Sequence, residues 1–259
     1  MNIVVCIKQV PDTNEVKIDP KTGTLIREGV PSIINPDDKN ALEEALVLKD
    51  KHGANVTVIS MGPPQAEKAL REALAMGADE AILITDRAFA GADTLATSNA
   101  LAGALRKLKY DIIFAGRQAI DGDTAQVGPG IAVHLDIPQI TYVEKVEIDG
   151  SSLKVRRAWE DGYETIQVNT PVLLTAIKEL NEPRYMNVKN IFETFKKEVK
   201  VWSANDIDVD RALLGLAGSP TKVKKSMTKE AKGQGEVINK PAKEAAEYAV
   251  SKLKEKHFI

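Results

Sequence analysis

The chain has 259 residues, 43% hydrophobic and 28% charged, so it is long enough for one large or two small domains and too apolar for disorder. A net charge of -2 excludes a general electrostatic attraction to nucleic acid or to an anionic membrane. One cysteine and three scattered histidines exclude a disulfide framework and argue against a metal site. No run approaches the ~20 apolar residues that cross a bilayer, and the run at 2–7 is too short for a signal peptide, so we expect a cytoplasmic protein without membrane insertion.

Apolar runs and amphipathic stretches alternate along the first 140 residues. Continuous runs rich in β-branched residues predict strands buried on both faces at 3–7, 56–59, 81–84 and 112–115. Apolar residues that recur every three or four positions predict helices at 38–52, 64–76 and 93–109. We therefore predict an α/β fold with a doubly wound, mostly parallel, Rossmann-like sheet and helices on both faces.

The pattern changes after residue 139. Alternating segments separated by Asp149-Gly150 and Asp161-Gly162 are typical of hairpins, so we expect an antiparallel hairpin region to extend the sheet. The stretch 218–241 is rich in glycine, proline and lysine and indicates a linker or arm, either a solvated tether or a docking site for an acidic partner. A last helix follows at about 242–256. We divide the chain into an α/β nucleotide-binding domain over 1–200 and a C-terminal arm and helix over 201–259 that packs on a partner chain.

A stretch rich in glycine and aspartate, 116–130, directly follows the fourth predicted strand, where doubly wound sheets bind ligands. Asp123 or Thr124 is expected to cap the next helix, whose free amides would bind a phosphate or pyrophosphate. The carboxylates of Asp121 and Asp123 would repel phosphate, so we expect them to bond ribose hydroxyls or amides. Glycines would let the ligand approach the backbone closely, at positions 116, 122, 128 and 130.

The alternative interpretation of this stretch is an ordinary strand-to-helix turn. Similar cap-like turns precede the other predicted helices, at 35–38, 61–63 and 91–94, and together they favour a nucleotide-binding rim at one edge of the sheet. The sequence has neither of the two commonest phosphate-binding motifs and no nucleophile elbow. Cys6 lies inside a predicted buried strand, and we assign no catalytic residue.

Five stretches resemble the β (small) subunit of electron transfer flavoprotein and occur in the expected order over about residues 1–200. They are Val5-Cys6-Ile7-Lys8-Gln9-Val10-Pro11, Asn35-Pro36, Ala73-Leu74-Ala75-Met76-Gly77-Ala78-Asp79, Gly116-Arg117-Gln118-Ala119-Ile120-Asp121 and Leu180-Asn181-Glu182-Pro183-Arg184-Tyr185. The last two are highly specific to the family, whereas the C-terminal arm matches only loosely.

The resemblance implies an obligate heterodimer with an α subunit, in which this chain holds an adenine nucleotide. Carried over by position, the nucleotide contacts are Cys6, Asn35, Pro36, Asp37, Asp38, Met61, Gly116, Arg117, Gln118, Ala119, Ile120, Asp121, Gly122, Asp123, Thr124, Ala125, Gln126 and Val127. Ordinary members bind AMP. The loop 121–129, together with Asp93 and Thr94 in the stretch 92–98, looks like the electron-bifurcating branch, in which a second FAD replaces AMP and NADH is the electron donor.

In the family, a loop after the Asn-Glu-Pro-Arg-Tyr motif docks onto acyl-CoA dehydrogenases through a leucine. Here Val188 occupies that position, and Lys189 stands where a proline is usual. The expected contact residues are Arg184, Tyr185, Val188, Ile191 and Phe192. The alternative is a surface connection without a partner.

The preferred hypothesis is a β subunit whose FAD takes a hydride from NADH. One electron then goes to a ferredoxin or flavodoxin, and the other goes through the α-subunit FAD to an acyl-CoA dehydrogenase, with NADH oxidation only in the heterodimer. The alternatives are an electron carrier that binds AMP and a nucleotide-binding sensor or scaffold without a redox role. Two roles stay open for Arg156, Arg157 and Trp159, which either flank the flavin or support the sheet.

Overall fold

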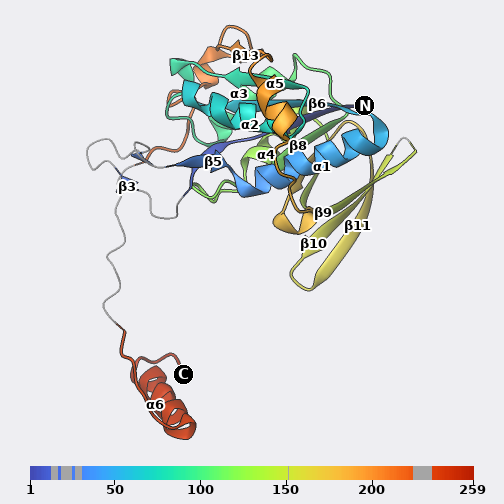
Figure 1. Cartoon of the computed structure of the whole chain (residues 1–259). Helices are drawn as coiled ribbons and strands as arrows, with labels where there is room; N and C mark the ends of the chain where they lie inside the picture. Colours follow the sequence, from blue (N-terminus) through green and yellow to red (C-terminus); the bar gives the residue numbers. More distant parts are fainter. Residues whose placement is uncertain (13–16, 19–24, 27–30, 151, 224–234) are drawn as a thin grey trace. The chain divides into compact units, whose positions relative to one another are not determined.

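The structure, a computed structural model, describes residues 1–12, 17–18, 25–26, 31–150, 152–223 and 235–259. Within them the main sheet has nine strands in the order β11-β10-β9-β12-β8-β1-β6-β7-β13 (Figure 1). Their bounds are β1 (Asn2–Cys6), β6 (Asn55–Met61), β7 (Glu80–Ile84), β8 (Ile112–Gly116), β9 (Gln139–Asp149), β10 (Ser152–Trp159), β11 (Gly162–Asn169), β12 (Val172–Ala176) and β13 (Val199–Trp202). The seven strands β9, β12, β8, β1, β6, β7 and β13, adjacent in this order, all pair in parallel. Strand β10 pairs antiparallel with both β9 and β11. The predicted mostly parallel α/β sheet with an antiparallel extension is confirmed.

Strand β1 lies at the centre of the sheet, between β6 and β8. The run Ile3, Val4 and Val5 is completely buried, as expected for a strand covered on both faces. From β1 the chain adds β6 and β7 on one side, and it then adds β8 and β12 on the other. The strand order therefore reverses between β1 and β8, and the crevice outside their carboxyl ends is where open α/β sheets bind ligands.

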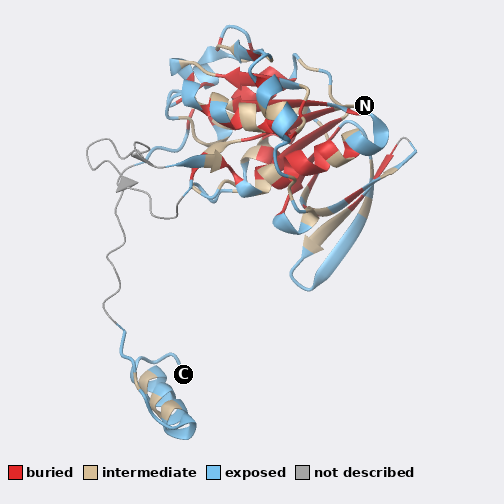
Figure 2. Ribbon diagram, viewed as in Figure 1, coloured by how far each residue is buried: buried red, intermediate tan, exposed pale blue. Residues whose placement is uncertain are grey.

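Helices cover both faces of the sheet, and the buried residues concentrate in the sheet and on the helices (Figure 2). The buried apolar residues form two separate clusters. Helices α1 (Pro36–His52) and α2 (Glu67–Met76) contribute to one cluster, and α3 (Thr94–Leu105) and α4 (Val127–Leu135) contribute to the other. Short 3₁₀ turns are η1 (Pro64–Ala66), η2 (Arg87–Phe89), η3 (Lys178–Leu180) and η4 (Arg211–Leu213). Two small ribbons pair β2 (Gln9–Pro11) with β5 (Ser32–Ile34) and β3 (Lys17–Ile18) with β4 (Leu25–Ile26). The predicted helices are present, with α3 ending earlier than expected.

The β9–β11 ribbon packs its inner side chains, among them Leu153 and Val155, into the same apolar cluster as α1. The first hairpin turn contains Gly150 in the left-handed conformation at φ 61°, as the Asp-Gly pair predicts. The second turn differs from the prediction. Glu160 and Asp161 form it, and Gly162 already begins β11.

The described residues after 180 contain a helix and a strand that the sequence did not predict, α5 (Val188–Thr194) and β13. The chain divides into the compact units Met1–Lys224 and Lys225–Ile259, so the boundary lies after Lys224 and not after residue 200. The reason is that β13 pairs with β7 and that Ile207 and Leu214 are buried in the first unit. The second unit contains α6 (Ala242–Glu255), which matches the predicted last helix. Part of the predicted linker, 224–234, lies outside the described residues.

Among the described residues, no helix is both long and apolar enough to span a membrane.

Candidate nucleotide site

The loop between β8 and α4 begins at the sheet edge where the strand order reverses, and Asn35 fixes its first half. Asn35 is 0% exposed. Its side-chain amide donates to the Gln118 carbonyl at 2.8 Å and its oxygen accepts from the Ile120 amide at 3.0 Å. The Asn35 backbone amide donates to the Lys8 carbonyl at 2.9 Å. Asn35 therefore ties the loop to the end of β1.

Asp38, in the first turn of α1, makes a second set of ties at the same edge. Its carboxylate accepts from the Lys8 amide at 2.8 Å and from the Gly116 amide at 3.0 Å. Burial raises the pKa of Asp38 to about 7, although hydrogen bonds from these amides and from Asn35 act in the opposite direction. Because Asp38 is buried and its carboxylate already has these donors, it joins β1, β8 and α1 and presents no free side chain to a ligand.

Further side-chain contacts run along the loop. The Lys8 ammonium lies 2.6 Å from an Asp121 carboxylate oxygen, and the Gln118 side chain donates to Asp123 at 2.9 Å. Asp121 and Asp123 thus bond protein groups, and the expected ribose contacts remain predictions. Arg117 lies 3.4 Å from the Asp37 carboxylate, which makes a salt bridge at the rim.

The second half of the loop, residues 122–126, is open to solvent. Gly122, Asp123, Thr124 and Gln126 are exposed. Asp123 and Ala125 adopt left-handed backbone conformations at φ 48° and 52°, which L-residues rarely populate. Such strain persists where the surrounding structure imposes it, and it often marks functional sites.

Helix α4 begins at Val127 with Gln126 as its N-cap, and Gln126 makes no side-chain cap bond. The prediction that Asp123 or Thr124 caps this helix is therefore wrong, because both precede the N-cap. The first-turn amides of Val127 and Gly128 have no side-chain acceptor from the N-cap. Pro129, which lacks an amide, falls within the first turn, where that loss is tolerated. This nine-residue helix offers free donors and its positive dipole end to an anion.

The neighbouring helix α3 differs, because its N-terminus is already satisfied. Asp93 is the N-cap and accepts from the Leu95 and Ala96 amides at 3.0 Å. Desolvation raises the pKa of Asp93, but hydrogen bonds from the Ala96 and Thr221 amides outweigh it and hold this pKa below its usual value. Thr94 donates to the Gln126 side chain at 2.7 Å and links the two helix N-termini. The first-turn amides of α3 are therefore already bonded by its N-cap, whereas those of α4 have no side-chain acceptor from the N-cap.

The four glycines expected to admit a ligand have two different roles. A Cβ on Gly116 would lie 2.3 Å from Asp38 Oδ1, one on Gly128 would lie 2.6 Å from Thr175, and one on Gly130 would lie 2.7 Å from Ser98. These three glycines therefore serve internal packing, contrary to the prediction. Only Gly122 has open space within 4 Å.

Two further predicted contacts lie beside the loop. Cys6 is buried, and desolvation, followed by the charge of Asp38, raises the pKa of its thiol to about 12, so it is not a nucleophile. Met61 is half-buried and, with Lys8, lines a hollow of about 60 Å³ at the rim.

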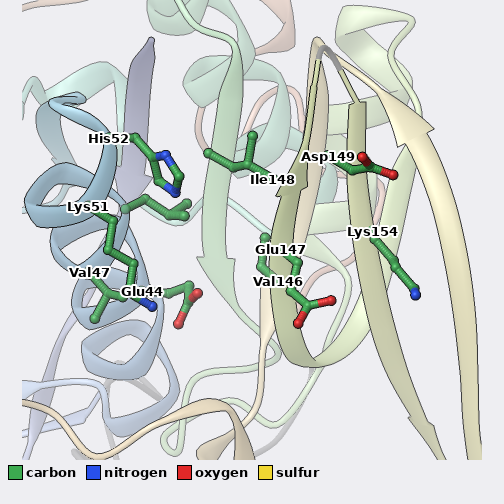
Figure 3. Close-up of a pocket in the computed structure, with 10 residues that line it drawn as sticks. Glu44, Val47, Lys51, His52, Val146, Glu147, Ile148, Asp149 and Lys154 are labelled. Atoms are coloured by element: carbon green, nitrogen blue, oxygen red, sulfur yellow. The ribbon is translucent and has the colours of Figure 1, made fainter.

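A larger cleft of about 490 Å³ lies elsewhere, between α1 and the β9–β10 hairpin. Figure 3 shows Glu44, Lys51 and His52 on the helix side and Glu147 and Asp149 on the hairpin side. None of the predicted site residues lines this cleft.

The predicted docking segment is anchored by its Asn-Glu-Pro-Arg motif to α1. Arg184 bonds the buried Glu43 carboxylate at 2.9 Å and Asp50 at 2.9 Å, and the Glu43 hydrogen bond is the main cause that raises the pKa of Arg184. Asn181 donates to the Asn40 carbonyl at 3.1 Å and to Glu44 at 3.1 Å. These contacts make Arg184 an internal anchor for the segment.

Apolar side chains after this anchor face solvent. Tyr185 is 97% exposed, and Val188 and Phe192 are each 69% exposed, whereas Ile191 is partly covered. Phe195, which the sequence reasoning did not include, is 77% exposed. Exposed apolar residues this close together are typical of a protein–protein contact.

The three hairpin residues whose role was open pair with one another and with their neighbours. Arg157 lies 4.4 Å from the Trp159 ring centre, and Arg156 lies 4.7 Å from that of Tyr163 and 2.6 Å from the Glu144 carboxylate. These pairs stabilise the hairpin surface.

The fold is that of an α/β protein with a doubly wound sheet, and the uncapped N-terminus of α4 lies beside the point where the strand order reverses. The chain belongs to the electron transfer flavoprotein family, because residues 22–207 match the electron transfer flavoprotein domain. It is 78% identical over 259 residues to the electron transfer flavoprotein subunit beta of Clostridium acetobutylicum, covering 100% of both chains. It is 58% identical over 262 residues to the caffeyl-CoA reductase-Etf complex subunit CarD of Acetobacterium woodii, again covering 100% of both.

A third relative is the acryloyl-CoA reductase electron transfer subunit gamma of Anaerotignum propionicum, which is 47% identical over 268 residues and matched over 100% of both chains. These full-length matches give the chain the role of a β-type subunit in electron transfer, with an α-type subunit as its partner.

Proposed function

We propose that this chain, in the heterodimer, binds FAD at the loop 116–127 and takes electrons from NADH. One electron goes to a ferredoxin or flavodoxin, and the other goes through the α-subunit FAD to an acyl-CoA dehydrogenase in the cytoplasm. The observation that carries the proposal is the uncapped N-terminus of α4 beside the exposed loop residues 122–126.

The residues present fit an anionic adenine nucleotide. The Val127 and Gly128 amides would hold its phosphates, and Thr94 and Gln126 lie between the two helix N-termini where a pyrophosphate would pass. The open space at Gly122 leaves room for a coenzyme longer than AMP. The chemistry that FAD supplies when bound is acceptance of a hydride and release of single electrons, so the protein contributes binding and orientation.

The exposed apolar residues of the docking segment support contact with an acyl-CoA dehydrogenase. Two relatives are named for caffeyl-CoA reductase and acryloyl-CoA reductase, which favours a partner that acts on acyl-CoA substrates. The arm and helix α6 leave Val250 and Leu253 exposed, and we propose that they pack on the α subunit.

The test is an anaerobic assay of the heterodimer with NADH, ferredoxin, an enoyl-CoA and its dehydrogenase. We expect ferredoxin reduction only when the enoyl-CoA and the dehydrogenase are both present, with half of the electrons recovered in each product. A heterodimer that is inert toward NADH but accepts electrons from a dehydrogenase would favour the carrier that binds AMP. A heterodimer that accepts electrons from neither donor would favour the sensor or scaffold.

A further inference from the structure

Asn35 and Asp123 are both expected to contact the nucleotide, but they differ in exposure to solvent. Asn35 is completely buried, whereas Asp123 is exposed. A side chain with no accessible surface has no face to offer to a ligand, so Asn35 needs another role.

Hydrogen bonds show what Asn35 does instead. Its carboxamide donates to the Gln118 carbonyl and accepts from the Ile120 amide, in the way that a strand neighbour would pair with this part of the loop. The Gly122 and Asp123 amides then donate to the Ala119 carbonyl at 3.2 and 2.9 Å, which forms a turn directly after the clamped segment.

The turn leads into the two strained residues of the open half, Asp123 and Ala125. Left-handed conformations at residues other than glycine persist only where neighbouring contacts determine the backbone. The Asn35 bonds to Gln118 and Ile120 hold the chain just before these residues, and the Thr94 bond to Gln126 holds it just after them.

We propose that Asn35 is a positioning residue of the nucleotide site, which holds residues 118–121 so that residues 122–126 and the α4 N-terminus face the ligand. Residues 118–121 of the loop are thus held by Asn35, and residues 122–126 bind the ligand together with the α4 N-terminus. This inference rests on the proposed nucleotide site, and it concerns the adenylate part common to AMP and FAD.

Wild-type heterodimer freed of nucleotide gives the first test, by amide hydrogen exchange with and without added AMP. The Ile120 amide and its neighbours in 118–121 are protected before AMP is added, and AMP adds protection in 122–128. Protection of 118–121 that appears only with AMP overturns the inference.

Replacement of the donor gives the second test. Asn35→Asp keeps the size and the acceptor but removes the amide that bonds Gln118, so exchange at 118–121 accelerates and AMP binding weakens at least about tenfold. The matched control is Asn40→Asp. It removes a comparable hydrogen bond, which the buried Asn40 side-chain amide in α1 donates to the Asn181 carbonyl. We expect the control to leave AMP binding unchanged.

The outcomes separate the two proposals. Faster exchange at 118–121 with unchanged AMP affinity in Asn35→Asp contradicts the positioning role. A wild-type heterodimer that binds neither AMP nor FAD contradicts the nucleotide site itself, whatever the exchange at 118–121.

Discussion

Replacing Gly116 with alanine should destabilise the protein strongly, because the added Cβ has no room. It would lie 2.3 Å from Asp38 Oδ1, 2.7 Å from the Asp38 nitrogen and 2.8 Å from the Asp37 carbonyl carbon. Two of these atoms belong to the backbone of the first turn of α1, so relief requires α1 to move away from β8. That movement breaks the Gly116 to Asp38 hydrogen bond of 3.0 Å.

The expected cost combines two effects. Overpacking of a tight site costs roughly 1–3 kcal/mol, and loss of a buried hydrogen bond to a charged group costs roughly 1.5–3 kcal/mol. Together they give a loss of about 3–5 kcal/mol in the free energy of unfolding, which corresponds to a fall of roughly 10 °C in the melting temperature of a chain of this size.

The matched control is Gly122→Ala, in the same loop. A Cβ there meets nothing within 4 Å, and Gly122 is not among the residues with positive φ. We expect an unchanged or slightly higher melting temperature, since alanine restricts the unfolded chain. Thermal denaturation of the two variant heterodimers measures the difference. Equal melting temperatures would refute the packing argument for Gly116.

Three further predictions address other parts of the molecule. Val188→Asp should abolish electron transfer to the acyl-CoA dehydrogenase and leave NADH oxidation by an artificial electron acceptor intact. Val133→Asp, similarly exposed but on α4, should affect neither activity; loss of transfer to the dehydrogenase in both variants, or in neither, would contradict docking by this segment. Cys6, the only cysteine, should resist alkylation of the folded chain at mildly alkaline pH, because its pKa is about 12, and mass spectrometry showing rapid labelling without unfolding would disprove its burial. The pKa of Asp38 is raised to about 7, so the folded chain keeps a proton that the unfolded chain has lost, and the stability from this group falls as the pH rises from about 4 to 7. Denaturation midpoints across that range should show this slope in the wild type and lack it in Asp38→Asn, and an equal slope in both would argue against Asp38 as its source.

Local sequence patterns predicted the main elements of the fold because continuous apolar runs and helical periodicity directly reflect burial. Strand β13 and helix α5 were missed because such patterns appear only where an element is buried. Both are short and mostly exposed, so neither carries a clear apolar pattern. Strand β13 forms because the edge of β7 is available for pairing, which is a tertiary contact.

The sequence predicted a loop directly after the fourth strand, at the edge of the sheet, but it did not predict which residues of the proposed site form internal hydrogen bonds. Asn35 and Asp38 were assigned as ligand contacts by position from the family resemblance. Their side-chain partners in the structure, Gln118 and Ile120 for Asn35 and the Lys8 and Gly116 amides for Asp38, are far away in sequence, and only the folded sheet brings them within reach. Similarly, Arg184 was assigned to the docking surface, although Glu43, a charged residue on a largely buried helix, requires an internal partner.

We propose that the rim beside α4 holds an adenylate that is extended here into FAD. Denaturing the purified heterodimer and quantifying the released nucleotides tests it most directly. We predict two molecules of FAD per heterodimer and no AMP. One FAD accompanied by one AMP would contradict the claim, and so would a heterodimer with no nucleotide in this subunit.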